Sequence, residues 1–222
     1  GRPGVSFGAF DARDISSRYL GLTPTVRTEI VNVIRADYAP YQVTIVSSDE
    51  GPPPAEAHST IHFGADDNDL LGLADNVDLY NADSQQAAII YTDAFATYEI
   101  MELSAEEMGL MIGNVASHEL GHLLGLYHTK NPTDVMDTTG SAWDLAGSQS
   151  FERAELEPSV FPYGHENSPR LLEQTVGRRP DFVESSRPTA ASSTKVERAM
   201  RVRQAAQLSL RGRCGTCLHL DD

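Results

Sequence analysis

The sequence predicts an α/β (α+β) fold in which a helix, three strands and a second, longer helix follow one another along the chain. Three observations carry this prediction. Residues 23–38 have apolar side chains at helical spacing, residues 41–47, 59–63 and 87–92 read as strands, and residues 104–124 combine a helix start with an apolar stripe. A chain of 222 residues that is 40% hydrophobic is long enough for one packed domain with an appendage.

The first helix has a clear beginning and a clear end. Thr23 is predicted as its N-cap and Pro24 as its first helical residue, since proline lacks the amide hydrogen that this position would leave unpaired. Pro40 prevents the helix from continuing. The apolar face repeats every four residues, at Val26, Ile30 and Ile34.

The three strands are shorter and their signals are local. In the segment 41–47, Val43 and Ile45 fall on one face because side chains alternate along a strand. Residues 51–54 (Gly-Pro-Pro-Pro) are predicted to form a loop, and residues 64–86 are rich in Asp, Asn and Gly.

The long second helix is predicted at residues 104–124. Ser104 and Glu107 have the spacing of a capping box, in which each side chain accepts the other residue's backbone N–H. We expect this helix to be mostly buried. Its apolar stripe consists of Met111, Val115, Leu120 and Leu124.

The predicted domain covers residues 1–177, and the remainder divides in two. Short helices are predicted near 149–157 and 168–176. Residues 178–194, rich in Arg, Pro, Ser and Thr, read as a linker, and residues 195–222 as a basic helical tail that contains Cys214-x-x-Cys217.

The second helix carries HELGHLLGLYH at 118–128, with the spacing H-E-x-x-H-x-x-G-x-x-H. His118 and His122 are four residues apart, so a helix places them on one face, where two imidazoles can bind one transition metal. Glu119 lies beside such a metal, where a general base is needed. Gly125 allows the chain to turn back in the left-handed conformation and bring His128 in as a third ligand.

Three histidine ligands are typical of a catalytic zinc site, because they leave one coordination position open for water. A structural zinc site is more often closed by four protein ligands, commonly including cysteine. No cysteine is close to this motif in the sequence.

The long motif resembles that of the metzincins, a clan of zinc-dependent endopeptidases. A second metzincin element, a methionine turn beneath the metal, is matched by Met136 in Asp-Val-Met-Asp. Thr129 and the short gap to Met136 are similar to matrixins, whereas Gly-Leu-Tyr-His-Thr at 125–129 is equally similar to pappalysins. The resemblance implies a twisted mixed sheet over an active-site helix, with a mostly irregular and helical lower half.

The same resemblance implies an endopeptidase that hydrolyses peptide bonds of proteins by attack of a zinc-bound water, with Glu119 as base. A protein or peptide substrate would pair with an edge strand, expected at 87–92, and Thr138 and Thr139 would shape the pocket for the residue after the cut. Two alternatives stay open at this point: a non-catalytic zinc-binding or adhesion module on the same fold, and a latent peptidase inhibited by its C-terminal tail, for instance by Cys214.

Two further metal sites are open questions. Hard oxygen ligands of the kind that Ca²⁺ prefers gather in one stretch, which is either a structural calcium site or a solvated acidic loop. The candidate ligands are Asp66, Asp67, Asp69, Asp75 and Asp78. His58 and His62 are either a second zinc pair or ordinary strand histidines.

The net charge of −15 and the pI near 4.7 argue against nucleic acid as a main partner. No apolar run approaches the length of a membrane span. The resemblance implies a secreted or extracytoplasmic protein, although no signal peptide is visible at residues 1–20. The basic tail is either a solvated helix or makes an intramolecular contact with the acidic body.

Overall fold

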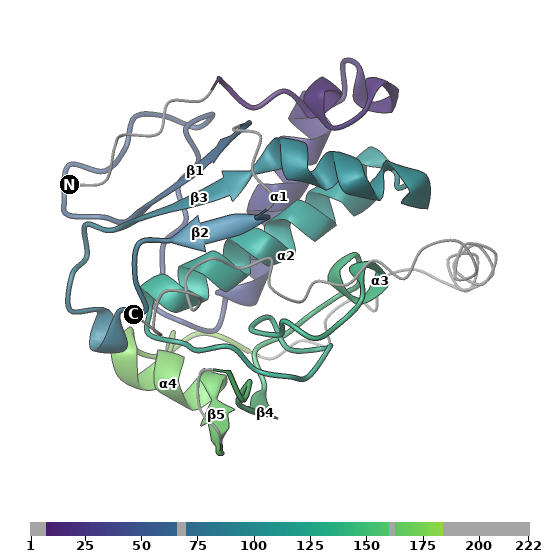
Figure 1. Ribbon diagram of the computed structural model, residues 1–222. Helices are drawn as coiled ribbons and strands as arrows, with labels where there is room; N and C mark the ends of the chain where they lie inside the picture. The colour runs from purple at the N-terminus through teal and green to yellow at the C-terminus, as the bar shows by residue number, and fades with distance from the viewer. Residues whose placement is uncertain (1–7, 66–69, 160–162, 184–222) are drawn as a thin grey trace.

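The computed structural model describes residues 8–65, 70–159 and 163–183. A small sheet lies on one side of two long helices, and a second group of short elements lies below them (Figure 1). The long helices are α1 (Thr23–Asp37) and α2 (Ala105–Leu123). Short 3₁₀ helices lie before α1, at Ala12–Asp14 and Ser17–Tyr19, and between α1 and α2, at Leu79–Asn81 and Thr92–Met101.

The sheet is mixed and has the order β1-β3-β2. Strand β1 (Thr60–Gly64) runs parallel to β3 (Ala87–Tyr91), and β2 (Gly72–Ala74) runs antiparallel to it. The predicted strands at 59–63 and 87–92 are therefore confirmed. The expectation that 87–92 forms an edge is wrong, because β3 pairs on both sides, and β2 lies at an edge among the described strands. No pattern in the sequence indicated β2, which is only three residues long.

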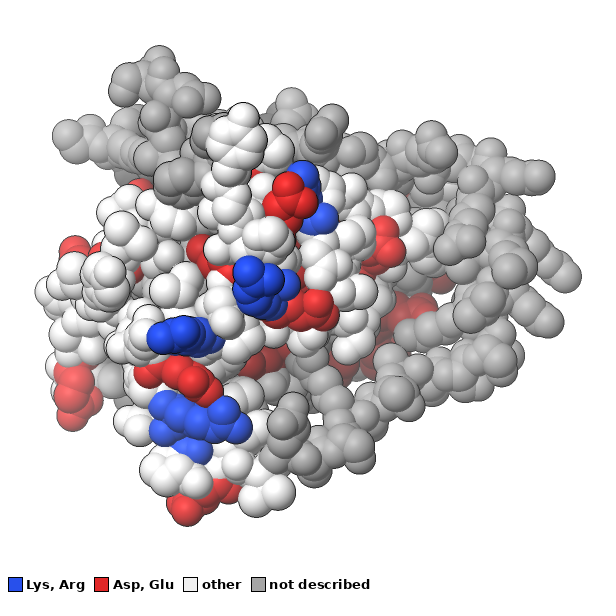
Figure 2. Space-filling model, turned by 90° about the horizontal axis from the view of Figure 1, so that it is seen from below, with Lys and Arg blue, Asp and Glu red and all other residues white. Residues whose placement is uncertain are grey.

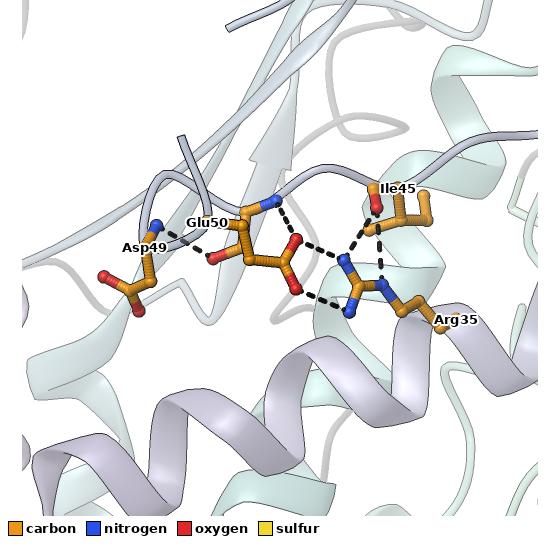
Figure 3. Close-up of polar contacts among 5 residues, drawn as sticks. Arg35, Ile45, Asp49 and Glu50 are labelled. Atoms are coloured by element: carbon orange, nitrogen blue, oxygen red, sulfur yellow. Dashed lines mark hydrogen bonds and ion pairs between the residues drawn. The ribbon is translucent and has the colours of Figure 1, made fainter. Parts of the chain in front are cut away.

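The predicted strand at 41–47 is not a strand. Tyr41 forms only an isolated bridge with Arg178. The backbone carbonyl of Ile45 accepts from the Arg35 guanidinium, which also binds Glu50 through two nitrogens, at 2.9 and 2.5 Å (Figure 3). The Arg35 side chain from α1 therefore donates to the Ile45 carbonyl, which in a sheet would accept a hydrogen bond from a neighbouring strand. Val43 and Ile45 alternate because both side chains pack on the core. The segment does not pair with a neighbouring strand there.

Helix α1 has the predicted extent but not the predicted cap. The N-cap is Leu22, which makes no side-chain capping hydrogen bond, and Thr23 is the first helical residue. The Thr23 hydroxyl instead donates to Asp11 and accepts the backbone N–H of Ala12. It thus joins the start of the helix to the preceding turn.

Helix α2 confirms the predicted capping box between Ser104 and Glu107, and the helix is almost entirely buried. It packs closely on α1 through glycines. A Cβ atom at Gly113 would lie 2.7 Å from Val33 Cβ, and one at Gly109 would lie 2.6 Å from Glu29 Cβ. Since real Cβ atoms do not approach so closely, any larger residue at these two positions would force the helices apart.

The lower part contains α3 (Ala142–Leu145), the antiparallel pair β4 (Arg153–Glu155) and β5 (His165–Asn167), and α4 (Ser168–Thr175). The predicted helix at 168–176 is confirmed. The predicted helix at 149–157 is wrong, because this segment includes β4. Figure 1 shows this group beneath α2, so it lies on the side of that helix opposite the sheet.

The first residues of the predicted linker are bonded to the domain, because the backbone N–H of Arg179 donates to Pro40 and its side chain donates to Val43. The basic tail and Cys214 lie outside the described residues. On the lower face, basic and acidic side chains lie next to one another (Figure 2). In the described ranges, no helix combines the length and apolar character that crossing a bilayer requires.

Candidate metal centre

The C-terminal end of α2 has the geometry that the motif predicted. Gly125 has a φ of 91°, in the left-handed region that glycine adopts at little cost. Its N–H donates to the carbonyl of His122, and the N–H of Leu126 donates to Gly121. This pair of bonds is a Schellman motif, which ends the helix and reverses the chain. The reversal carries His128 back toward the helix.

The three predicted histidines meet at one point. The Nε2 atom of His122 lies 3.1 Å from Nε2 of His118 and 3.1 Å from Nε2 of His128. All three side chains are buried, and their ligand atoms lie within 4.8 Å of one another. A tetrahedral zinc with bonds of about 2.0–2.1 Å separates its nitrogen ligands by about 3.3 Å. The two separations of 3.1 Å are close to this value, so the cluster of three histidines fits a zinc ion.

The protonation of the rings also fits a metal. The Nδ1 atom of His118 lies 2.8 Å from the carbonyl of Val135, and that of His122 lies 2.7 Å from the carbonyl of Leu126. Because a carbonyl only accepts, each Nδ1 must carry the hydrogen, and each Nε2 presents its lone pair to the centre.

Burial keeps these rings neutral. It lowers the pKa of His118 to about 4 and holds the pKa values of His122 and His128 well below the usual range, with the neighbouring histidines as a further cause. Two lone pairs that face each other at 3.1 Å in a buried place repel, and a cation between them removes that repulsion. The donor set of three neutral imidazoles therefore fits zinc.

Glu119 follows the first histidine and is 1% exposed. Its side chain lies against Gly72 of β2, where a Cβ atom would come within 2.5 Å of the carboxylate Oε1. The edge strand thus leaves room for this carboxylate only because residue 72 has no side chain. Gly72 is a residue that the sequence analysis missed, since one glycine in a glycine-rich segment carries no distinguishing signal.

Met136 lies directly beneath the second half of α2. It is fully buried, and a Cβ atom at Gly121 would lie 2.5 Å from its sulfur. Gly121 immediately precedes the ligand His122, so Met136 supports the turn of helix that carries that ligand. The role of Met136 as a methionine turn beneath a metal stays a prediction.

A cavity of about 40 Å³ opens beside His118 and Glu119. Helix α2 forms one wall, and Asn114 joins it to the opposite wall by donating to the carbonyls of Leu145 and Gly147. Thr138 lines the cavity, whereas the Thr139 hydroxyl donates to Asp137. Much of the lining is apolar, and the apolar residues are Leu71, Val115, Val135 and Leu145.

The calcium ligands predicted from the acidic stretch are only partly described. Asp66, Asp67 and Asp69 lie outside the described residues. Asp75 accepts the backbone N–H of Ala87, and Asp78 accepts those of Ala82 and Asp83. These two carboxylates therefore cap backbone groups, and the calcium site stays a prediction.

The alternative of a second zinc site gains no support. His58 lies outside β1, so it does not share a strand with His62. Within the described ranges, the triad of His118, His122 and His128 is the one group of His, Cys, Asp or Glu side chains spaced to hold a metal.

Glu166 of β5 is a buried carboxylate close to the metal-binding turn. It accepts the backbone N–H of Tyr127 at 2.9 Å and the Ser168 hydroxyl at 3.2 Å, and burial raises its pKa to about 7. A carboxyl whose pKa is higher in the folded state than in the unfolded state stabilises the fold below its unfolded pKa. That stability is lost as the pH rises through the folded value.

We therefore expect a pH-dependent difference between the wild type and Glu166→Gln. From pH 5 to pH 8, the unfolding free energy of the wild type should fall by about 2 kcal/mol relative to the variant. Urea unfolding of the zinc-loaded proteins at several pH values measures this. The exposed Glu155, whose pKa is lowered by Lys130, is the control, and Glu155→Gln should give a small difference of opposite sign. Parallel profiles for the wild type and Glu166→Gln would contradict the assignment.

Comparison with known families also supports a zinc site at the three histidines. Residues 43–149 match the matrixin model of the peptidase M10 family. This range contains the three histidines, Glu119 and Met136. No solved structure gives a significant match to the chain.

Proposed function

The chain is a metzincin-type member, and from this premise we propose that it is a zinc-dependent endopeptidase. The observation that carries the proposal is the convergence of three buried imidazoles, kept neutral by burial, with a buried carboxylate next to the first of them in the sequence. The matrixin match and the histidine triad support a zinc metallopeptidase in general. The proposal adds the roles of individual residues and the kind of substrate.

In this proposal His118, His122 and His128 hold the zinc ion. Zinc, when bound, lowers the pKa of a coordinated water and polarises the carbonyl of the scissile bond. Glu119 accepts a proton from the attacking water and then donates it to the leaving amine. Its side chain is buried and lies against Gly72.

The substrate would be an extended peptide that pairs with β2, which lies at the edge of the sheet among the described strands. Such pairing supplies main-chain hydrogen bonds that do not depend on sequence. Gly72 of β2 lies against Glu119, so a peptide on this edge passes next to the base. The cavity beside His118 would take the side chain of the residue after the cut. The apolar part of its lining favours an aliphatic side chain there.

Two alternatives come from other classes of function. A non-catalytic zinc-binding module needs the three histidines but gives no reason for a buried carboxylate beside them. A latent peptidase inhibited by its tail would involve residues outside the described ranges. We also propose a secreted or extracytoplasmic location, in keeping with a peptidase that acts on other proteins.

A mixed peptide library tests the proposal. The zinc-loaded chain should cut peptides internally, with aliphatic residues enriched after the cut, and 1,10-phenanthroline should stop the reaction. Added Zn²⁺ should restore it after the chelator is removed, because the folded chain keeps the three ligands together. A zinc-loaded chain that cuts no peptide would contradict a constitutive endopeptidase and favour one of the two alternatives.

A further inference from the structure

Asp134 is a fully buried carboxylate that the proposed reaction does not use. It lies in the turn between His128 and Met136, and both of its oxygens are occupied. Oδ2 accepts the Thr129 hydroxyl at 2.8 Å, and Oδ1 accepts the backbone N–H of Met136 and of Glu152, each at 3.3 Å. Burial of a carboxylate is costly unless such partners are present, so its position is closely specified.

The residues that Asp134 joins are the neighbours of the metal ligands. Thr129 follows His128, and its backbone N–H donates to the carbonyl of Met136 at 2.9 Å. Val135 follows Asp134, and its carbonyl accepts a hydrogen bond from Nδ1 of His118. One carboxylate therefore links the strand-like segment after the third ligand to the turn that orients the first ligand.

His128 depends on this link more than the other ligands do. His118 and His122 are fixed by α2, whereas His128 lies beyond the turn at Gly125. The described contacts that hold its backbone include the bond from the Glu157 N–H to its carbonyl and the pairing of Thr129 with the methionine turn. A loss of that pairing would let the third nitrogen move away from the other two.

We propose that Asp134, acting through Thr129, is a positioning residue that holds His128 in place for zinc. The inference rests on the zinc-binding part of the proposed function and does not depend on peptide hydrolysis. Partners that orient metal ligands typically change metal affinity by 10–100-fold when they are removed. They do so without touching the metal.

The test measures zinc affinity of the full chain by competition with a chromophoric chelator. Asp134→Ala should weaken zinc binding by about 10–100-fold. Asp134→Asn should stay within about fivefold of the wild type, because an amide can accept the two backbone N–H groups and donate to Thr129. The visible absorption spectrum of the Co²⁺-loaded protein should change in Asp134→Ala and be restored in Asp134→Asn.

Thr129→Val removes the hydroxyl while keeping the shape of the side chain. We expect an intermediate loss of zinc affinity, and little further loss when the change is added to Asp134→Ala, since the hydroxyl acts through that carboxylate. This variant also keeps the test decisive if Asp134→Ala does not fold.

Leu172→Ala is the matched control for a general loss of stability. Leu172 is fully buried in α4, an element that carries none of the three histidines, so its truncation should lower stability and leave zinc affinity unchanged. Equal weakening of zinc binding by Leu172→Ala and Asp134→Ala would overturn the proposal. An unchanged zinc affinity and cobalt spectrum in Asp134→Ala and Thr129→Val would also overturn it. Failure of peptide cleavage in the wild type would affect the proposed peptidase activity and not this inference.

Discussion

Glu119→Gln is expected to lower kcat for peptide hydrolysis by about 10²–10⁴-fold, the usual contribution of a general base. Glutamine has the size of glutamate, so it fits in the same space against Gly72, but its amide cannot accept the proton from water at neutral pH. Zinc affinity should stay within a few-fold of the wild type, because Glu119 is not among the ligands. KM should change little, since in the proposed binding mode the strand edge and the pocket hold the substrate.

Steady-state kinetics on one peptide identified from the library, together with zinc content, measures this prediction. Glu106→Gln is a suitable control because Glu106 is an exposed residue in the first turn of the same helix. It should have wild-type kinetics. A Glu119→Gln variant that keeps full activity, or that loses zinc and activity in proportion, would show that the carboxylate is not the base.

His122→Ala is expected to have the largest effect on metal binding. His122 is the middle ligand, within 3.1 Å of both other nitrogens, and its removal leaves two ligands that no longer enclose the ion. We expect zinc affinity to fall by at least 10³-fold and peptide cleavage to disappear. Because zinc binds the folded state, it stabilises the wild type by about 2.7 kcal/mol at a free concentration of 100 times Kd. The variant should lose this effect.

Thermal unfolding with and without Zn²⁺ distinguishes loss of the metal from loss of the fold. The Tm of the wild type should rise when zinc is added, whereas the Tm of His122→Ala should not respond. His58→Ala should behave as the wild type and bind one zinc per chain in equilibrium dialysis. Loss of a bound zinc in His58→Ala would instead restore the idea of a second site.

The elements predicted well from the sequence are those whose signals are local. Helix α2 was predicted because Ser104 and Glu107 determine its start and the motif determines its end, and both depend on neighbours along the chain. The metal ligands were predicted for the same reason, since four-residue spacing on a helix and a glycine turn fix their relative positions.

The errors concern contacts between distant residues. The segment 41–47 alternates like a strand, yet Arg35 binds the carbonyl of Ile45 in place of a partner strand. Strand order depends on pairing over long distances, so nothing local indicated that β3 has partners on both sides. Asp134 and Gly72 gain their importance only from the side chains that the fold brings to them. Neither residue type has a spacing that would have singled it out.

The glycines of α2 have a consequence for how this helix and the metal site form. Gly109, Gly113 and Gly121 each leave space for a close neighbour, and each weakens an isolated helix by about 1 kcal/mol relative to alanine. We therefore expect the isolated segment to have little helical structure, because short helices depend on packing for their stability. His118 and His122 approach each other only when this helix forms, so we expect zinc binding and folding of α2 to stabilise one another.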